Sequence, residues 1–304
     1  MKISIASGKG GTGKTTIAVS LALSVPGPVV LLDCDVEEPN SGIFFPNFTA
    51  EGKESVTVPV PVINESLCTA CGECGRFCEF SAIVCLGTSV MVFAELCHSC
   101  GGCTMVCPHS ALKEEPSRIG DLVYRTIPRT GEGTTEPISF VHGLLSIGKA
   151  MSPPLIRAVK KRGTIEAEKL AKEHGCEPLI LIDSPPGTSC PMITTVSETD
   201  YVILVTEPTP FGLHDLDLAV KTVRKLGLPF GVVINRSDSG DDRVCKYCER
   251  EEIPILLQIP EDLRIAQGYS SGKPLVESAP EYRKDFVALA EAVKKAVKAE
   301  GKVE

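Results

Sequence analysis

The feature that most constrains this chain is a cysteine motif that occurs twice in its first half. Residues 67–83 (LCTACGECGRFCEFSAI) and 96–112 (LCHSCGGCTMVCPHSAL) align at an offset of 29, with eight of 17 positions identical. Each copy contains the spacing C-x-x-C-x-x-C-x-x-x-C, and nine of the 14 cysteines lie between Cys68 and Cys107. Because the start of the chain shows no secretory signal pattern, so many thiols favour a bound metal or redox group over disulfides.

This spacing matches the bacterial two-cluster ferredoxin run, in which the fourth cysteine of each copy binds the other cluster. The match predicts two [4Fe–4S] clusters: cluster I on Cys68, Cys71, Cys74 and Cys107, and cluster II on Cys97, Cys100, Cys103 and Cys78. Zinc is the alternative, although zinc sites usually pair two C-x-x-C knuckles. The first copy departs from the pattern at Glu79, where the second has Pro108, and loses no ligand.

The segments on either side of the repeat alternate between short apolar runs and helical patterns. Near-continuous apolar runs are typical of parallel strands covered on both faces, and their alternation with helices predicts a doubly wound α/β sheet. We expect strands at Lys2–Ala6, Val29–Asp33, Asp121–Ile127, Pro137–Ile147, Leu179–Asp183, Tyr201–Thr206, Phe230–Asn235 and Ile255–Ile259. We expect helices at Lys14–Ser24, Ser152–Lys161, Ile165–Glu173, Leu213–Leu226, Asp242–Glu252 and Pro280–Ala299. Residues 62–115 are then an inserted ferredoxin-like domain, and 1–61 with 116–304 form one discontinuous domain.

A second motif, GKGGTGKT over residues 8–15, satisfies the phosphate-loop pattern G-x-x-x-x-G-K-[ST]. It follows an expected strand and opens an expected helix, which is the context that this motif requires. Backbone N–H groups of such a loop converge on phosphate oxygens, and the helix dipole adds to the attraction. We expect Lys14 to reach the β- and γ-phosphates and Thr15 to hold Mg²⁺. The expected nucleotide-binding residues of the loop are Gly8, Gly10, Gly11, Thr12, Gly13, Lys14, Thr15 and Thr16.

The run GKGGTGKTT, with its additional Lys9, resembles the deviant loop of the MinD/ParA/Mrp/nitrogenase-iron-protein family. Four further motifs resemble that family in the same order: LLDCD at 31–35, ILIDSPPG at 180–187, VINR at 233–236 and IPED at 259–262. The resemblance covers both flanks of the cysteine repeat. It implies that Lys9 crosses a dimer interface to the nucleotide of a second subunit.

The same resemblance implies roles for the residues that end the expected strands. Asp35 would orient the attacking water, while Asp33 and Asp183 would act at Mg²⁺, an ion that prefers carboxylate oxygen. Asn235 would read the adenine edge, and the loop Pro260–Asp262 would close over the base. The expected catalytic set is therefore Lys9, Lys14 and Asp35.

The resemblance implies an ATPase that hydrolyses Mg-ATP as a nucleotide-dependent homodimer and couples ATP to its clusters. The coupling could serve electron delivery to a redox partner, or cluster assembly on an iron–sulfur client protein as in Mrp-type carriers. The complete duplicate ligand set favours permanent redox clusters. A MinD-like or ParA-like positioning ATPase is an alternative, and an electron-transfer module with a degenerate ATPase is another.

Composition limits the partners. The net charge of −8 argues against nucleic acid, because affinity there comes mostly from neutralised phosphates. No apolar stretch is long enough to span a membrane, and the amphipathic C-terminal helix is expected to pack on the protein rather than anchor it. We therefore expect a cytoplasmic protein.

Six cysteines lie outside the two ligand sets. Cys245 and Cys248 form a C-x-x-C after the strand-end Asn, as in Mrp-type proteins, where two subunits share a [4Fe–4S] cluster. That resemblance predicts a third, bridging cluster here. Cys190 follows Asp183 at a distance similar to that of a cluster cysteine in the nitrogenase iron protein. The remaining ones, Cys34, Cys85 and Cys176, are expected to pack as small apolar side chains.

Overall fold

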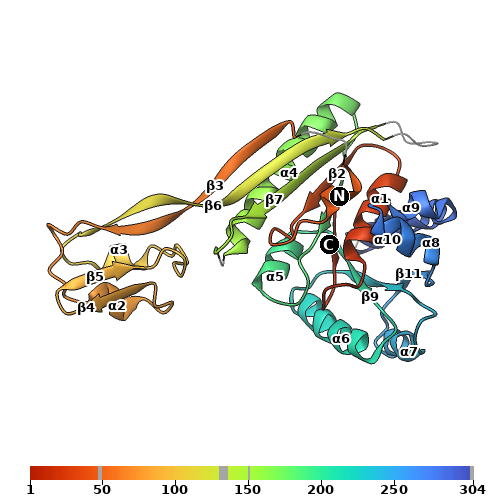
Figure 1. Ribbon diagram of the computed structural model, residues 1–304. Helices are drawn as coiled ribbons and strands as arrows, with labels where there is room; N and C mark the ends of the chain where they lie inside the picture. The colour runs from red at the N-terminus through yellow and green to blue at the C-terminus, as the bar shows by residue number, and fades with distance from the viewer. Residues whose placement is uncertain (47–49, 130–135, 150, 302–304) are drawn as a thin grey trace.

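A computed structural model of the chain describes residues 1–46, 50–129, 136–149 and 151–301. Its centre is a nine-stranded sheet with the order β11-β10-β9-β1-β8-β2-β7-β6-β3 (Figure 1). The strands are β1 (Lys2–Ala6), β2 (Val29–Asp33), β3 (Gly52–Ile63), β6 (Leu112–Ile127), β7 (Ile138–Leu145), β8 (Leu179–Asp183), β9 (Tyr201–Thr206), β10 (Phe230–Asn235) and β11 (Ile255–Ile259). Six of them, β1, β2 and β8 to β11, begin and end at the predicted residues.

The sheet is parallel from β11 to β7 and antiparallel at its other end. Strands β2 and β8 pair in parallel with Asp33 opposite Asp183, so both carboxylates lie at one edge. Strand β6 pairs antiparallel with β7 and with β3. Because every parallel strand ends at the same edge, the motifs that follow β1, β2, β8 and β10 are brought together there.

Helices cover both faces of the sheet. They are α1 (Lys14–Ser24), α4 (Ser152–His174), α5 (Cys190–Val196), α6 (Pro210–Lys225), α7 (Arg243–Arg250), α8 (Leu263–Ser270), α9 (Leu275–Ser278) and α10 (Arg283–Glu300), with short 3-10 turns η1 (Ser41–Phe44) and η2 (Pro280–Tyr282). Buried side chains of α1, α9 and α10 share one core with the sheet. Those of α4 to α7 fill two cores on the opposite face.

Helix α4 is continuous, which corrects the predicted break between Lys161 and Ile165. Gly163 lies within this interval, and a Cβ at this position would lie 2.6 Å from Leu32 Cδ1. Glycine therefore allows α4 to approach β2 closely rather than ending the helix. Helix α6 begins three residues before its predicted start, because the Thr209 hydroxyl caps it by accepting a 3.0 Å hydrogen bond from Gly212 N.

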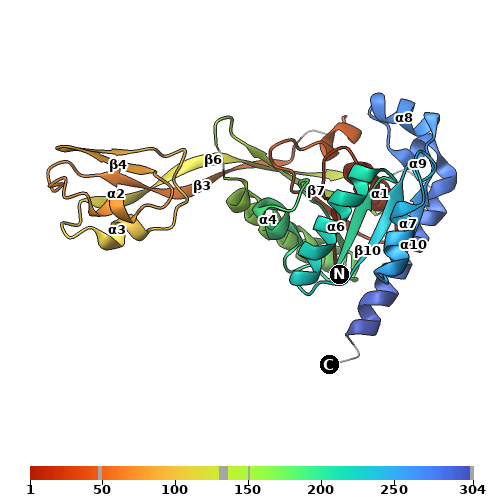
Figure 2. The same ribbon diagram turned by 90° about the horizontal axis from the view of Figure 1, so that it is seen from below.

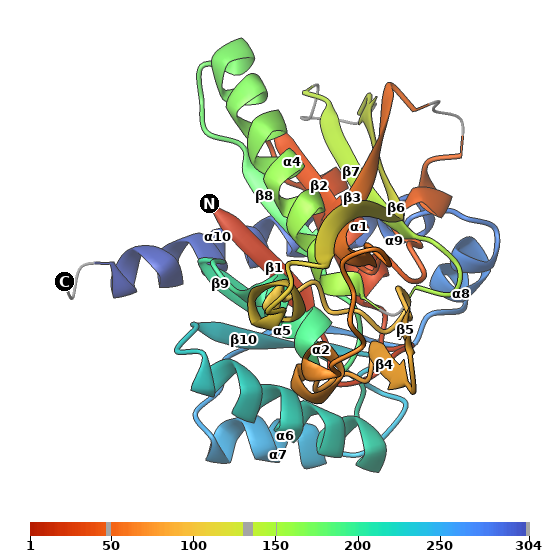
Figure 3. The same ribbon diagram turned by 90° about the vertical axis from the view of Figure 1, so that its left-hand side faces the viewer.

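Strands β3 and β6 continue beyond the sheet as a two-stranded ribbon (Figures 1 and 2). Its tip carries residues 64–111, which form α2 (Glu73–Phe77), β4 (Ile83–Leu86), β5 (Ser89–Val92) and α3 (Gly102–Val106). We call this segment the cysteine module. Viewed from this end, the module lies in front of the main sheet (Figure 3). The predicted strand Asp121–Ile127 is therefore only the base of the longer strand β6, and β3 was not predicted.

The last helix, α10, packs on the protein as predicted. Phe286, Leu289 and Val293 are at most 1% exposed and share the core of α1. Within the residues that the structure describes, no helix is long and apolar enough to cross a membrane.

Candidate nucleotide site and cysteine pockets

The loop between β1 and α1 is shaped by glycine. A Cβ on Gly8 would lie 2.0 Å from the backbone oxygen of Asp215 in α6. Gly13 caps α1 with φ of 93°, a left-handed conformation that other residues rarely adopt. The predicted loop glycines thus allow a close approach and a turn that leaves the N–H groups at the start of α1 without helical partners.

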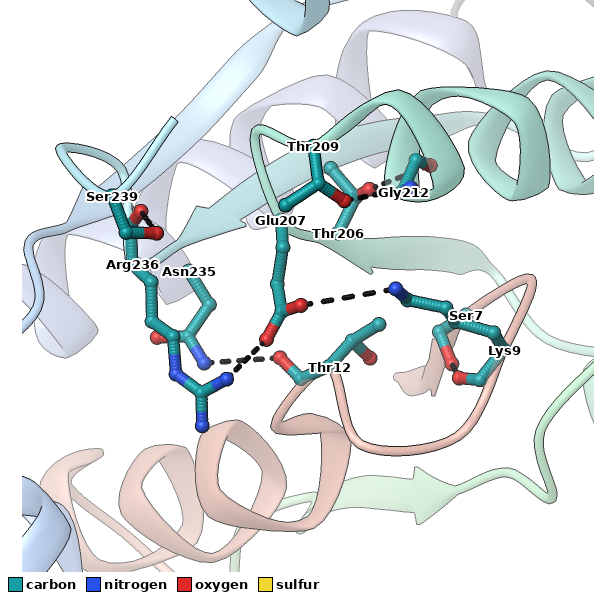
Figure 4. Close-up of polar contacts among 10 residues, drawn as sticks. All are labelled: Ser7, Lys9, Thr12, Thr206, Glu207, Thr209, Gly212, Asn235, Arg236 and Ser239. Carbon is teal, nitrogen blue, oxygen red and sulfur yellow. Dashed lines mark hydrogen bonds and ion pairs between the residues drawn. The ribbon is translucent and has the colours of Figure 1, made fainter. Parts of the chain in front are cut away.

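The amide of Asn235 holds this loop from the end of β10. Its Nδ2 donates a 3.0 Å hydrogen bond to the Thr12 carbonyl oxygen (Figure 4). A Cβ on Gly13 would lie 2.5 Å from the same nitrogen. Asn235 therefore supports the phosphate loop in this structure, and its contact with adenine stays a prediction.

Two buried carboxylates face each other at the ends of β2 and β8, and Ser41 connects them. Asp33 accepts hydrogen bonds from the backbone N–H groups of Ser41 at 2.9 Å and Asp35 at 3.1 Å. The Ser41 hydroxyl donates to Asp183 Oδ2 at 3.2 Å. The other oxygen, Asp183 Oδ1, is buried and has no hydrogen-bond partner among the described residues. Ser41 was missed by sequence analysis, because nothing in its neighbourhood predicts a contact with residue 183.

The charges at this edge fit a hard divalent cation. Burial raises the pKa of both Asp33 and Asp183, and their mutual repulsion raises that of Asp33 further. Burial and the nearby Asp183 also raise the pKa of Asp35 to about 6, against the opposing effect of Lys14. A cation bound by the free Asp183 oxygen would reduce the repulsion between these carboxylates. Mg²⁺ is commonly bound by carboxylate oxygens in this way. The Thr15 hydroxyl contacts Asp183, and its place beside Mg²⁺ stays a prediction.

Lys9 is engaged within its own chain. Its Nζ lies 3.8 Å from Glu207 Oε2, and Arg236 Nη1 lies 2.8 Å from Glu207 Oε1 (Figure 4). Neither Glu207 nor Arg236 was identified from the sequence. By contrast, Lys14 is buried, with only 7% of its surface exposed.

The Pro260–Asp262 loop lies beside the segment that follows Asn235. Glu261 N donates to Asp238 Oδ1 at 2.6 Å. Asp262 caps α8 by accepting a 2.8 Å hydrogen bond from Arg264 N. The loop thus lies at the nucleotide edge of the sheet, and its closure over a base stays a prediction.

The cysteine module contains two pockets that divide its eight repeat cysteines into two sets. One pocket is lined by Cys68, Cys71, Cys74 and Cys107, and the other by Cys78, Cys97, Cys100 and Cys103. Within the described part of the chain, no three His, Cys, Asp or Glu side chains are placed to hold a single metal ion.

The two copies of the repeat have matching backbone conformations. Ala70 and Ser99, which are 29 residues apart, have φ of 53° and 54°, and Gly72 and Gly101 have φ of 83° and 71°. Backbone N–H groups also point at sulfur: Ser99 N lies 3.4 Å from Cys97 Sγ, and a similar contact reaches Cys107 Sγ at 3.3 Å. Such donors suit anionic thiolate sulfur, so the residues fit a group that is bound by four thiolates.

The other cysteines are in different surroundings. Cys34 is buried, as predicted, whereas Cys176 is exposed; it follows Gly175, which ends α4 in a turn, so the prediction of internal packing was wrong. Cys190 is exposed at the start of α5. Cys248 is fully buried on α7 among apolar side chains. A cluster on Cys245 and Cys248 stays a prediction, and it would require Cys248 to leave this core.

Comparisons with known proteins agree with this architecture. A family model described as the CobQ/CobB/MinD/ParA nucleotide binding domain matches residues 3–275. An uncharacterized protein of Methanocaldococcus jannaschii is 35% identical over 238 residues, which are 78% of each chain. The iron-sulfur cluster carrier protein of Pyrococcus horikoshii is 26% identical over 317 residues, covering 95% of this chain and 84% of that protein. The septum site-determining protein MinD of Pyrococcus horikoshii, solved with Mg-ADP, superposes with a TM-score of 0.54 at 21% identity, covering 97% and 96% of the two chains.

Proposed function

The chain belongs to the CobQ/CobB/MinD/ParA family of nucleotide-binding domains and is a P-loop ATPase, and we propose that it couples ATP to electron delivery through two [4Fe–4S] clusters. The proposal includes a nucleotide-dependent homodimer and a redox partner protein. Residues 62–115 would be an inserted ferredoxin-like domain in the ATPase. The clusters, when bound, would supply one-electron carriers.

The division of the eight cysteines between two pockets is the observation that supports this proposal most. Each pocket takes three cysteines from one copy of the repeat and the fourth from the other copy, which is the arrangement of a two-cluster ferredoxin. Zinc stays the alternative, although zinc sites usually pair two C-x-x-C knuckles.

At the nucleotide site, the chain would neutralise phosphate charge and position water. Lys14 and the N–H groups of the loop would bind the phosphates, and Thr15, Asp33 and Asp183 would hold Mg²⁺. Asp35 would orient the attacking water. Lys9 would leave Glu207 and reach the nucleotide of the second subunit.

A short series of contacts connects this site to the cysteine module. Val36, next to Asp35, accepts a 2.8 Å hydrogen bond from Leu145 N at the end of β7. Four residues later, Lys149 Nζ lies 3.8 Å from Glu95 of the module. Two residues beyond Glu95, Cys97 packs against the core of the sheet. A displacement of the segment after β2 on nucleotide binding would therefore reach the second pocket through this loop.

A second candidate is an iron–sulfur cluster carrier, which two relatives favour by name. The proteins of Pyrococcus horikoshii and Pyrococcus abyssi that are called iron-sulfur cluster carriers match 95% and 90% of this chain. A carrier would give up its iron to a client, whereas a redox protein would retain it.

The test uses full-length protein purified without oxygen. We expect about eight iron atoms per chain and a rate of cluster reoxidation that differs between MgADP and a slowly hydrolysed ATP analogue. The variant Lys14→Ala should keep its iron and lose the nucleotide effect. A chain without iron, or reoxidation that is equal in all samples, would refute the proposal. Transfer of iron to an apo-ferredoxin without nucleotide-dependent reoxidation would select the carrier function instead.

A further inference from the structure

We propose that a cavity between α4, α5 and the sheet is a second anion site, which binds a small molecule with two phosphate groups through Arg157 and Lys161 on one side and Lys2 on the other. The cavity lies on the face of the sheet that α4 and α5 cover, whereas α1 packs on the opposite face. The inference goes beyond the proposed function, because it depends neither on the clusters nor on the phosphate loop.

The cavity is large enough for a small molecule. Its volume is about 450 Å³, within the range of roughly 300–1,000 Å³ that is common for such sites. Its walls are α4 and α5, which contact each other on one face of the sheet (Figure 3). Leu32 of β2 and Ile180 and Ile182 of β8 line its base. A ligand would therefore lie on an apolar surface, between two helices that supply the polar contacts.

The side chains that line the cavity are strongly cationic. Arg157, Lys160 and Lys161 line it from α4, and their spacing of three and four residues places them on one side of that helix. Lys2, at the start of β1, adds a fourth cation. Among the described residues that line the cavity, Glu198 alone is acidic, and 83% of its side chain is exposed. Four cations and one carboxylate leave a surplus of three positive charges.

Lys160 is the one cation of the four that the protein itself engages. Its Nζ donates hydrogen bonds to the carbonyl oxygens of Thr194, at 3.0 Å, and Ser197, and lies 3.9 Å from Glu198. These contacts hold the end of α5 against α4. Burial lowers the pKa of Lys160, and the positive charge of Lys2 acts in the same direction. The charge of Lys2 is therefore felt across the cavity.

The other three cations have no charged partner. Within the described ranges, the side chains of Lys2, Arg157 and Lys161 form no ion pair. In a protein with a net charge of −8, such a local concentration of positive charge favours an anionic ligand. A phosphate monoester carries about −1.5 to −2 charges at neutral pH, so two phosphate groups balance a surplus of three better than one does. Arginine also suits phosphate, because its planar fork donates two parallel hydrogen bonds.

The base of the cavity shows how the site relates to the nucleotide site. Leu32 and Ile182 directly precede Asp33 and Asp183, and neighbours on a strand point to opposite faces. The anion would thus lie behind the two strands that carry these carboxylates. It would share no side chain with the phosphate loop, so the two sites can be removed separately.

The experiment is a calorimetric titration of the full-length Lys14→Ala protein without Mg²⁺, which weakens binding at the phosphate loop. The probes are inorganic pyrophosphate and, separately, fructose 1,6-bisphosphate. We expect saturable binding of one probe molecule per chain. The probe that binds more tightly shows whether the two phosphate groups are joined directly or through a carbon frame.

Two further substitutions, each made in this background, remove a cation from opposite sides of the cavity. Arg157→Gln and Lys2→Gln should each raise the dissociation constant about tenfold or more, because each removes a contact with a charged group. Lys169→Gln is the matched control, since it removes one charge from an exposed position of α4 that does not line the cavity.

The control should bind the probes as tightly as its parent. Failure of both probes to bind would overturn the inference. Equal losses in Arg157→Gln and Lys169→Gln would also overturn it, because they would show a general attraction of anions to α4. Unchanged binding in Arg157→Gln would place the probe at the phosphate loop instead.

Discussion

Replacing Glu207 with glutamine should strengthen ATP-dependent dimerisation. In the single chain, Lys9 is held by Glu207 at 3.8 Å, with side-chain exposures of 31% and 12%. If Lys9 must reach the nucleotide of a second subunit, this ion pair has to break before the dimer forms. Glu207→Gln removes the competing carboxylate and leaves Arg236, which is 52% exposed, solvated by water.

The size of the effect follows from the geometry. A partly exposed ion pair of this length contributes about 0.2–1 kcal/mol. Two copies break per dimer, so the dimer should gain about 0.4–2 kcal/mol, which is roughly a two- to thirtyfold tighter dimerisation constant. Because the pair is exposed, the gain should shrink as the salt concentration rises.

Light scattering with a slowly hydrolysed ATP analogue, over a range of protein concentrations, measures this constant. The Lys9→Ala variant should dimerise more weakly than the parent, and adding Glu207→Gln to it should give no further gain. If Glu207→Gln weakens the dimer, or strengthens it equally in the Lys9→Ala background, Lys9 does not exchange Glu207 for a nucleotide.

Four other substitutions test separate parts of the molecule. Lys14→Ala should abolish nucleotide binding, whereas Asp35→Asn should keep the affinity for ATP and lower kcat about 100-fold or more; equal losses of affinity in calorimetry would contradict these roles. Gly8→Ala, whose Cβ would overlap a backbone oxygen of α6, should lower kcat/KM for ATP about 100-fold by displacing the loop, and a steady-state rate near that of the parent would disprove this. Phe286→Ala should reduce the free energy of unfolding by about 3–5 kcal/mol, because this side chain is fully buried. Denaturant titration measures this loss, with the exposed Lys295→Ala as the control. A clearly smaller loss would mean that α10 is only loosely attached.

The elements that sequence analysis predicted well are those with a strong local pattern. Strands such as β8 and β9 are buried along their whole length and therefore read as uninterrupted apolar runs. Strand β3 has alternating valines, but it also has exposed polar residues and two prolines, and proline within such a run argues against a strand. The predicted break in α4 was the opposite error: the interval contains Gly163, which allows close packing against Leu32 instead of ending the helix.

The residues of the candidate site also fall into two groups, those in a local motif and those with a partner distant in sequence. The phosphate loop and the cysteine spacing were recognised because each motif is contiguous and its chemistry fixes its residue types. Ser41, Glu207 and Arg236 were not, because each acts through a partner distant in sequence: Asp183 for Ser41, and Lys9 for Glu207. Only the fold, which brings the ends of the parallel strands to one edge, shows these contacts.

The prolines of the ribbon have a consequence for self-association. Beyond Gly120, where β7 no longer pairs with β6, the ribbon has two open edges, and open edges recruit strands from other molecules. Pro59 lies opposite Pro116, and Pro61 opposite Glu114. Because proline has no N–H, these positions cannot donate to an incoming strand on either edge. The prolines that made β3 hard to predict from the sequence therefore also hinder strands of other molecules from pairing with the exposed ribbon.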